Sequence, residues 1–424
     1  MTSWRPTPAL VRATLVSLGG IAGGLVLGLE VLAVLAAPFV VFALMGLLSR
    51  PGTTPTVSTA IDHHRLHEGQ GTTSRISLGD TTGVEHVTRV AAPTPHVATR
   101  PTYGAVGALT RDGLPVIEFS PRRWGRRSIG SERVALTSSW AGWRWGPEDL
   151  PAHGLNVLPQ PAPYDTRAEV PQPTGLVGSH RSRRIGSGTE FEGIRHFAAG
   201  DRLRRINWPV SLRTRELHVV TTRAEQDAGV WLVVDGLRDI GESGGIDGRA
   251  SSLDLTVRAA SALAEHHIRN GDRVGLLVVA ADSARVRLGA GRRHLHVLHG
   301  TLARVRTEAR AVPPERLDLG ADAGSVVYIL SPMLFTPLVT ATAALQRSGH
   351  SVVVIDTLGA PEGDGSRTDP ADLAARMQQI ERDDRLAQLA ALGCPVVPWR
   401  GPGTLDTVLH RLARRAQVPR LRAR

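Results

Sequence analysis

Residues 188–219 carry a dense set of side chains that can do chemistry, in the stretch GTEFEGIRHFAAGDRLRRINWPVSLRTRELHV. The stretch holds Glu, Asp, Arg, Trp and His, but no Cys and no paired-histidine spacing for a metal. Catalysis would need a nucleophile beside a base, or two carboxylates with shifted pKa values. Ser211 with His196 or His218 is the available set, and no spacing supports a triad. We therefore expect no catalytic residue, no enzyme activity and no cofactor.

The charged residues of this stretch fit a structural or interaction role better. Gly200 predicts a turn into a short helix, Asp201 takes the position of an N-terminal cap, and Pro209 limits any helix there. We expect a charged network that locks a β-rich module and its linker against an α/β domain, with Trp208 as its apolar anchor. The members of this network are Glu190, Arg195, Asp201, Arg204 and Arg213.

A second candidate site begins at Asp235, where DGLRDIGESGGIDG follows a buried apolar run. The carboxylates of this stretch are those of Asp235, Asp239, Glu242 and Asp247. Carboxylate oxygens suit hard cations, so the stretch is either a metal loop or a solvated glycine-rich loop. It lacks a GxGxxG pattern, and the absence of Lys from the chain excludes an ordinary P-loop.

Residues 226–424 alternate apolar strands with helices, which predicts a doubly wound parallel sheet in an α/β domain. Such sheets bind ligands at the carboxyl ends of their strands, so we expect a site in the loops after Asp235, Ala280, Leu330 and Asp356. Predicted strands cover 229–235, 272–280, 324–331 and 350–357, and predicted helices cover 252–270, 292–309, 336–348, 370–391 and 404–416.

Residues 13–48 form an apolar run in which Glu30 is the only charged residue. As one helix at ~1.5 Å per residue the run would reach roughly 54 Å, too long for one span of a ~30 Å hydrocarbon core. Two spans at about 13–29 and 31–48, with Glu30 at the turn, fit better. Flanking arginines then predict that residues 1–50 are a two-span anchor with both ends in the cytoplasm. A cleaved signal peptide is the alternative.

Residues 51–165 predict a β-sandwich-like module after a Pro/Thr-rich linker at 51–60, because short alternating runs are broken by Gly and Pro. A linker and motif segment follows at 166–225. The module contains RRWGRRSIGSERVALTSSWAGWRWG, with Trp among Arg. This is either a base-stacking face or a set of core and rim aromatics covered by Arg stems. The strand-like alternation of Trp143 and Trp145 favours the second interpretation.

The formal charge of +11 over 424 residues invites a nucleic-acid surface. All 50 basic residues are Arg, however, which a GC-rich codon bias explains more simply than phosphate contacts, so we expect no nucleic-acid partner. Cys394 is the single cysteine, which excludes an internal disulfide and a cysteine-based zinc site.

The chain resembles the bacterial membrane proteins of the domain of unknown function 58 family. The residues that carry the resemblance are Gly188, Glu190, Phe191, Arg195, Phe197, Gly200, Asp201, Arg204, Ile206, Asn207, Trp208, Ser211, Arg213 and Leu217. RRWGRRSIG and LNVLPQP look like the β module of that family, and the two apolar spans complete the resemblance. Asn207 departs from the Asp that is usual in the family.

The resemblance implies that residues 226–424 are similar to a von Willebrand factor A domain. The metal site of such domains uses Asp-x-Ser-x-Ser together with a Thr and an Asp from later loops. This chain departs by Leu237 and Asp239 at the Ser positions, Arg292 and Arg293 in place of the Thr, and Pro332 in place of the Asp. We therefore expect a degenerate site around Asp235 and Asp239 that holds no metal.

These expectations predict a membrane-tethered interaction or adaptor protein, located at the cell membrane with its body in the cytoplasm. The resemblance implies a MoxR-type AAA+ ATPase as partner, in protein remodelling or envelope maintenance. The alternatives are a basic nucleic-acid-binding protein and a hydrolase in the α/β domain. Besides the loop after Asp235, the expected interaction residues are Glu190, Arg195, Gly200, Asp201, Arg204, Asn207, Trp208, Ser211 and Arg213.

Overall fold

The structure is a computed structural model of mixed α/β type, with two apolar helices at the N-terminus and several sheets. It describes residues 3–80, 82–160, 185–198, 203, 206–223, 229–307, 317, 319–321, 325–358, 370–401 and 403–404, without the side chains of 185–192, 221–223, 370–372 and 375. The chain divides into two compact units, one of Met1–Gln160 with Gly244–Arg249 and one of Pro161–Ser243 with Ala250–Arg424.

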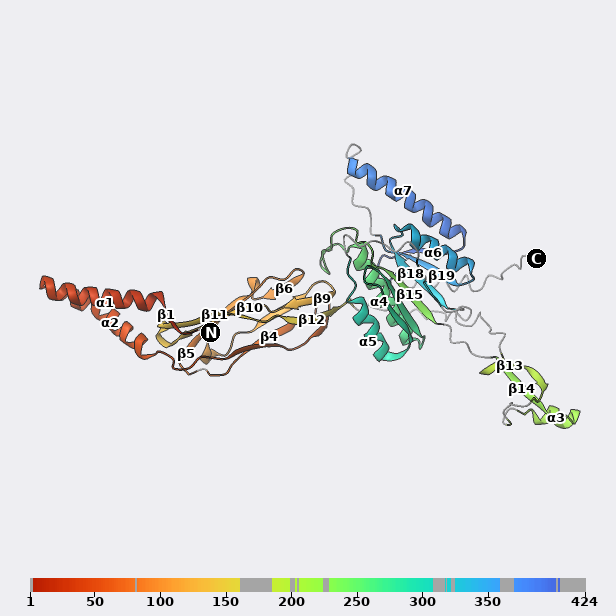
Figure 1. Ribbon diagram of the computed structural model, residues 1–424, viewed down its shortest axis with the longest axis horizontal. Helices are drawn as coiled ribbons and strands as arrows, with labels where there is room; N and C mark the ends of the chain where they lie inside the picture. The colour runs from red at the N-terminus through yellow and green to blue at the C-terminus, as the bar shows by residue number, and fades with distance from the viewer. Residues whose placement is uncertain are drawn as a thin grey trace. The chain divides into compact units, whose positions relative to one another are not determined.

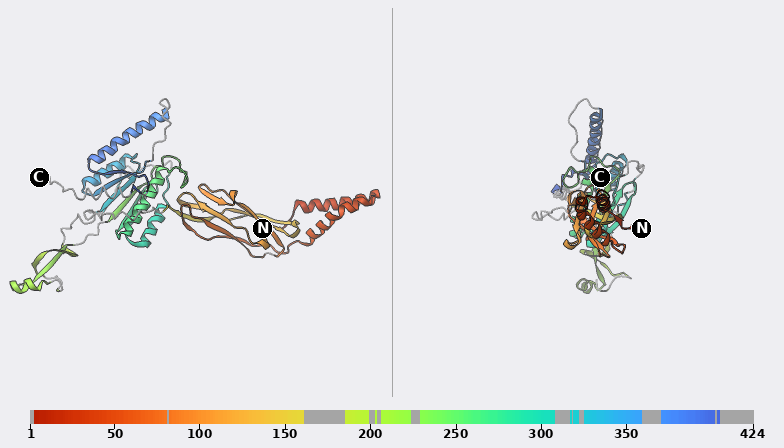
Figure 2. Two further views of the ribbon diagram at one scale, coloured as in Figure 1. Left: turned by 180° about the vertical axis from the view of Figure 1, so that it is seen from behind. Right: turned by 90° about the vertical axis from the view of Figure 1, so that its left-hand side faces the viewer.

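The first unit begins with α1 (Pro8–Leu27) and α2 (Glu30–Leu48), which lie side by side in Figures 1 and 2. Both helices are long and apolar enough to cross a membrane. Gly28, at φ 66°, ends α1, and Glu30 is the first residue of α2 rather than the turn itself. A Cβ on Gly20 would lie 2.6 Å from the Cβ of Ala36, so glycine at this position permits close packing of the two helices.

The rest of the first unit is a β module of three sheets. The strand orders are β1-β11-β10-β5-β7, β2-β4-β8-β6 and β3-β12-β9. The strand bounds are β1 Arg5–Pro6, β2 Val57–Ile61, β3 Arg65–His67, β4 Thr72–Leu78, β5 Val84–Ala91, β6 Val97–Arg100, β7 Ala105–Leu109, β8 Ile117–Pro121, β9 Gly125–Ile129, β10 Glu132–Ser138, β11 Trp143–Leu150 and β12 His153–Leu158. The segment 51–60, predicted as a linker, already enters β2 at Val57.

Two sheets of the module share a core, because Ile76 of β4 packs with Val87 of β5 and Leu136 of β10. The same core includes Leu10 of α1 and Ala43 of α2. The helix pair and the β module are therefore parts of one hydrophobic core.

The family-like stretch folds as a hairpin with a short helix. β13 (Ile185–His196) pairs antiparallel with β14 (His218–Arg223), and α3 (Trp208–Thr214) precedes β14. Asn207 caps α3 by accepting a hydrogen bond from the N–H of Val210 at 3.2 Å. Pro209 lies in the first turn of α3, where a missing N–H costs nothing, so the prediction that it limits a helix was wrong.

The second unit contains a sheet of order β17-β16-β15-β18-β19-β20, in which every neighbouring pair is parallel except β16 with β17. The strand bounds are β15 Val230–Asp235, β16 Val274–Val279, β17 Ala284–Gly289, β18 Val326–Ser331, β19 Ser351–Asp356 and β20 Val396–Pro398. The helix bounds are α4 Ser252–Arg269, α5 Gly291–Leu302, α6 Thr336–Arg347 and α7 Pro370–Ala391. In Figure 1, α4 and α5 lie on one side of the sheet and α6 and α7 on the other.

Two predictions for this unit need correction. β17 was not predicted, although its alternating charged and apolar residues (ARVRLG) suit a sheet edge. The helix expected at 292–309 ends at Leu302. The helix expected at 404–416 lies almost wholly outside the described residues.

Candidate functional site

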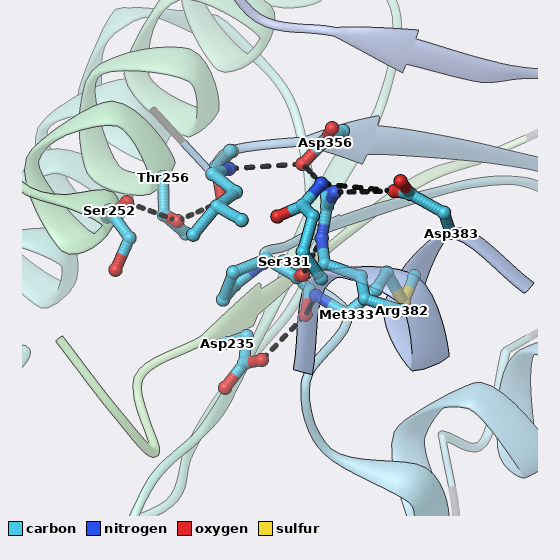
Figure 3. A network of polar contacts seen from close by, with 12 residues as sticks. Asp235, Ser252, Thr256, Ser331, Met333, Asp356, Arg382 and Asp383 are labelled. Carbon is cyan, nitrogen blue, oxygen red and sulfur yellow. Dashed lines mark hydrogen bonds and ion pairs between the residues drawn. The ribbon is translucent and has the colours of Figure 1, made fainter. Parts of the chain in front are cut away.

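Three polar residues end neighbouring parallel strands and meet at the carboxyl edge of the sheet (Figure 3). Asp235 ends β15, Ser331 ends β18 and Asp356 ends β19. This is the edge at which open α/β sheets bind ligands. The loops after Asp235, Leu330 and Asp356 thus converge as the strand alternation predicts.

Asp235 is buried, and hydrogen bonds occupy its two carboxylate oxygens. Ser331 donates its hydroxyl to Oδ2 at 2.6 Å, and the N–H of Leu237 donates to Oδ1 at 3.1 Å. Burial raises the pKa of Asp235, against the hydrogen bonds from Ser331 and Leu237 and the positive charge of Arg238. The Ser331 hydroxyl also accepts the N–H of Met333 at 2.8 Å. The arrangement closes the carboxylate off inside the protein.

The neighbouring carboxylate, Asp356, has a cationic partner. Arg382 of α7 forms an ion pair with Asp356 and donates through Nε to the carbonyl of Pro332 at 2.8 Å. The Arg382 side chain is 4% exposed, so this is a buried pair that joins α7 to the ends of β18 and β19. Arg382 was not among the predicted site residues. A signal existed, because Arg382 stands at helical spacing from Leu386 and Leu389 on the inward face of α7.

The four carboxylates of the DGLRDIGESGGIDG stretch do not come together. Asp239 accepts the N–H of Leu253 at 3.0 Å and so occupies the N-terminus of α4. Asp247 belongs to the first unit, where it pairs with Arg122. Among the residues that the structure describes, no group of three or more His, Cys, Asp or Glu is placed to hold a metal ion.

Arg292 and Arg293 do not lie near Asp235, where the Thr ligand of a metal site was expected. They lie in the first turn of α5, and His294 of the same turn contacts the carbonyl of Val274 at 2.7 Å. Val274 begins β16, so these arginines are at the amino edge of the sheet, opposite Asp235. The extra strand β17 reverses the chain before α5 and causes the difference.

Five of the expected interaction residues have described side chains. Asn207 caps α3, and Ser211 is buried, donating to the carbonyl of Asn207 at 2.7 Å and accepting the N–H of His218 at 2.9 Å. Trp208 is 58% exposed, and its role as the apolar anchor between the β module and the α/β domain stays a prediction. Arg195 donates to the carbonyl of His196 at 2.9 Å, and Arg213 is exposed.

The remaining expected interaction residues have no described side chains. These are Glu190, Gly200, Asp201 and Arg204, and they lie outside the described side chains. An ion-pair contact that the structure does describe in this hairpin joins His196 to Glu216 at 3.1 Å. The His218 imidazole contacts Thr214 Oγ1 and the carbonyl of Glu216 through Nδ1, whereas the Ser211 hydroxyl accepts the backbone N–H of His218.

The Trp and Arg stretch of the β module is mostly core. Trp124, Trp143 and Trp145 are buried, whereas Trp140 is 53% exposed. The Arg50 guanidinium lies 4.9 Å from the ring centre of Trp143, as expected for Arg stems over core aromatics. Three of the four rings are thus inaccessible to nucleic-acid bases.

The comparisons with known proteins agree with the resemblance over part of the chain. The family described as "Protein of unknown function DUF58" matches residues 193–364, which excludes α1, α2 and the β module. An uncharacterized protein of Mycobacterium bovis and two of Mycobacterium tuberculosis are each 35% identical to the chain over 131 residues, 30% of this chain. The chain spans 40% of the length of these relatives.

Proposed function

We propose that this protein is a membrane-tethered adaptor that binds a MoxR-type AAA+ ATPase through the family-like hairpin. The observation that carries the proposal is an exposed apolar pair on α3. Trp208 and Leu212, 58% and 77% exposed, are four residues apart and therefore share one helix face. An exposed Trp on a short rigid helix is the kind of side chain that anchors protein interfaces.

The contacts beneath α3 support an interaction role. Ser211 is tied to β14 through the N–H of His218, and Asn207 fixes the first turn of the helix. The polar residues of the motif thus hold α3 in place, while the apolar residues point outward. We propose that the polar residues are architecture and that Trp208 and Leu212 make the contact.

The α/β unit fits a von Willebrand A-like domain that works without a metal. An antiparallel edge strand on an otherwise parallel sheet is common in doubly wound α/β folds, and β17 has that position. Ser331 fills the role that a bridging cation would have, by donating directly to Asp235. Ser331 is fully buried, so it lacks the access to substrate that a hydrolytic nucleophile needs.

The full-length protein in detergent, immobilised and exposed to lysate of its own cells, tests this proposal. We expect wild type to retain an AAA+ ATPase and Trp208→Ala and Leu212→Ala to lose most of it. Leu373→Ala, which removes a 55% exposed apolar residue from α7, is the matched control and should leave retention unchanged. Equal retention by all variants would show that α3 is not the contact.

A second candidate function, binding of a phosphate-rich polymer, is favoured by one observation. Arg273, Arg285 and Arg287 line a pocket of about 590 Å³ with Trp231 and Leu288. Binding of RNA or DNA oligonucleotides that weakens steeply with salt, and is lost in Arg273→Gln with Arg287→Gln, would favour this function over the adaptor.

A further inference from the structure

One end of the β module is hydrogen-bonded to the N-terminal end of α1 and the C-terminal end of α2. The loop Ser139–Gly142 receives a hydrogen bond from the N–H of Thr7 to the carbonyl of Gly142 at 2.9 Å. Ser49 donates its hydroxyl to the carbonyl of Ser139 at 2.9 Å. Trp143 donates its indole N–H to the carbonyl of Gly46 at 2.9 Å. The start of α1 and the end of α2 therefore clamp this loop.

Close packing keeps the loop at the level of the helix ends. A Cβ on Gly142 would lie 2.9 Å from both the Cα and the carbonyl oxygen of Gly46, so two backbones touch here. Leu10 of α1 shares a core with Trp143 and Trp145 of β11. A loop held by backbone contact and a common core cannot move far along the helix axes.

This geometry has a consequence that rests on the proposed membrane anchor. A pair of spanning helices places its polar ends at the membrane interface. Because Pro8 begins α1 and Leu48 ends α2, the clamped loop lies at the headgroup level of the bilayer.

The loop exposes the type of side chain that prefers that level. Trp140 is 53% exposed at the loop tip, with φ at 60°, and its backbone N–H donates to the Glu85 carboxylate at 3.2 Å. Tryptophan concentrates at membrane interfaces because an apolar ring and a polar N–H suit the two sides of the boundary.

Four exposed arginines surround the clamped end. Arg5 of β1 lies directly opposite Arg144 of β11, Arg50 follows α2, and Arg12 lies near the start of α1. Among the described residues none of the four is in an ion pair. Like charges directly opposite each other in a sheet repel, and an external anion relieves that repulsion. The carboxylate of the acidic neighbour Glu85 accepts a hydrogen bond from the backbone N–H of Trp140.

We propose that the Ser139–Gly142 loop and these four arginines form a lipid-binding foot that takes the headgroups of anionic phospholipids, with Trp140 inserted at headgroup depth. Each arginine near an anionic leaflet adds electrostatic attraction to the lipid headgroups. The Trp140 ring sets the depth at which the loop enters the headgroup layer. The foot holds the β module in a fixed orientation on the membrane surface.

The module offers a matched control at its other end. Tyr103 is 89% exposed and also has a positive φ, 69°. Tyr103 lies just before β7, and the first residue of β7 pairs with Val90 near the end of β5. The foot adjoins Val84, which is at the start of β5. At ~3.3 Å per residue the two ends are separated by roughly 20 Å. Arg100, exposed and near Tyr103, is the corresponding control for charge.

The experiment uses the full chain in lipid nanodiscs, with Cys394→Ser to remove the single native cysteine. Trp140→Cys, Tyr103→Cys and Val26→Cys are labelled separately with an environment-sensitive fluorophore. Quenching by brominated phosphatidylglycerol and by brominated phosphatidylcholine is then compared at each site. We expect quenching at 140 and 26 but not at 103, and stronger quenching by phosphatidylglycerol at 140.

Arginine variants test the lipid preference. Arg5→Gln and Arg144→Gln should each reduce the preference for phosphatidylglycerol at position 140, by up to about fivefold, whereas Arg100→Gln should not. Quenching at 26 without quenching at 140 would overturn the foot while leaving the membrane anchor intact. Quenching at neither 26 nor 140 would overturn both. Equal quenching by the two lipids at 140, unaffected by the arginine variants, would overturn the anionic headgroup as ligand.

Discussion

The β module and the α/β unit each bury a carboxylate, but they treat it differently. In the β module Glu132 is fully buried beside the fully buried Arg89, with nitrogen and oxygen 2.7 Å apart. Arg89 also donates to the carbonyls of Ser74 and Pro115. In the α/β unit Asp235 is buried with hydrogen bonds from Ser331 and Leu237 and with no ion pair among the described residues.

The presence or absence of a cationic partner distinguishes Glu132, a structural charge, from Asp235, a charge at the candidate site. A paired and hydrogen-bonded charge has its desolvation offset, so removing one partner is costly. A buried carboxylate without a cation keeps part of that cost, which the raised pKa of Asp235 reports. Asp235 lies at the carboxyl edge of the sheet, where α/β domains bind ligands. Glu132 lies in the core of the β module.

The largest expected effect comes from Arg89→Met, which leaves Glu132 buried without its partner. We expect the free energy of unfolding of the β module to fall by about 3–5 kcal/mol. Hydrogen exchange measured on peptides of β5 and β10 reads this module separately from the α/β unit. Arg133→Met is the control, because the Arg133–Asp149 pair is 72% and 79% exposed and is worth no more than about 1 kcal/mol. An equal loss in both variants would contradict the comparison.

A smaller loss is expected from Arg382→Leu in the α/β unit. Asp356 then loses its cation, but its side chain is 14% exposed and retains the N–H of Leu358. We expect destabilisation of about 2–3 kcal/mol, seen as faster exchange in β19 and α7. Arg385→Leu, on the partly exposed Arg385–Glu381 pair one turn away, should change exchange little.

Asp235→Asn should have the smallest effect and the opposite sign. Because the folded pKa of Asp235 is raised, its stabilising contribution is present below the unfolded pKa of about 3.9 and is lost as pH rises through the folded pKa. Above the folded pKa the buried carboxylate is therefore a cost to the folded state. We expect Asn to raise the free energy of unfolding at pH 7 by about 1 kcal/mol, with the gain shrinking toward pH 4.

The control for this prediction is Asp239→Asn. Asp239 accepts a backbone N–H at the start of α4, where a negative charge is favourable, so its neutralisation should destabilise slightly at neutral pH. Denaturant unfolding across pH, read by exchange in β15 and β18, distinguishes the two signs. A pH-independent loss in Asp235→Asn would mean that its carboxylate is stabilising as the anion.

Local patterns predicted most elements well. The apolar run of residues 13–48 is two helices, and the apolar runs at 229–235 and 350–357 contain β15 and β19. The failures were β17, whose half-polar edge pattern resembles a loop, and the helix around Pro209, where a first-turn proline was taken for a boundary. The position of the site at the carboxyl edge of the sheet was predictable from the sequence. The contacts of Asp235 with Ser331 and of Asp356 with Arg382 were not.

The sequence by itself determined the two apolar helices and the alternation of strands and helices, because burial of apolar residues follows short-range periodicity. Only the tertiary structure decided which polar groups meet. Ser331 reaches Asp235 across 96 residues of chain, and Arg382 reaches the end of β19 from α7. The reversal at β17 sends Arg292 and Arg293 to the opposite edge. Such contacts depend on strand order, which spacing along the chain does not contain.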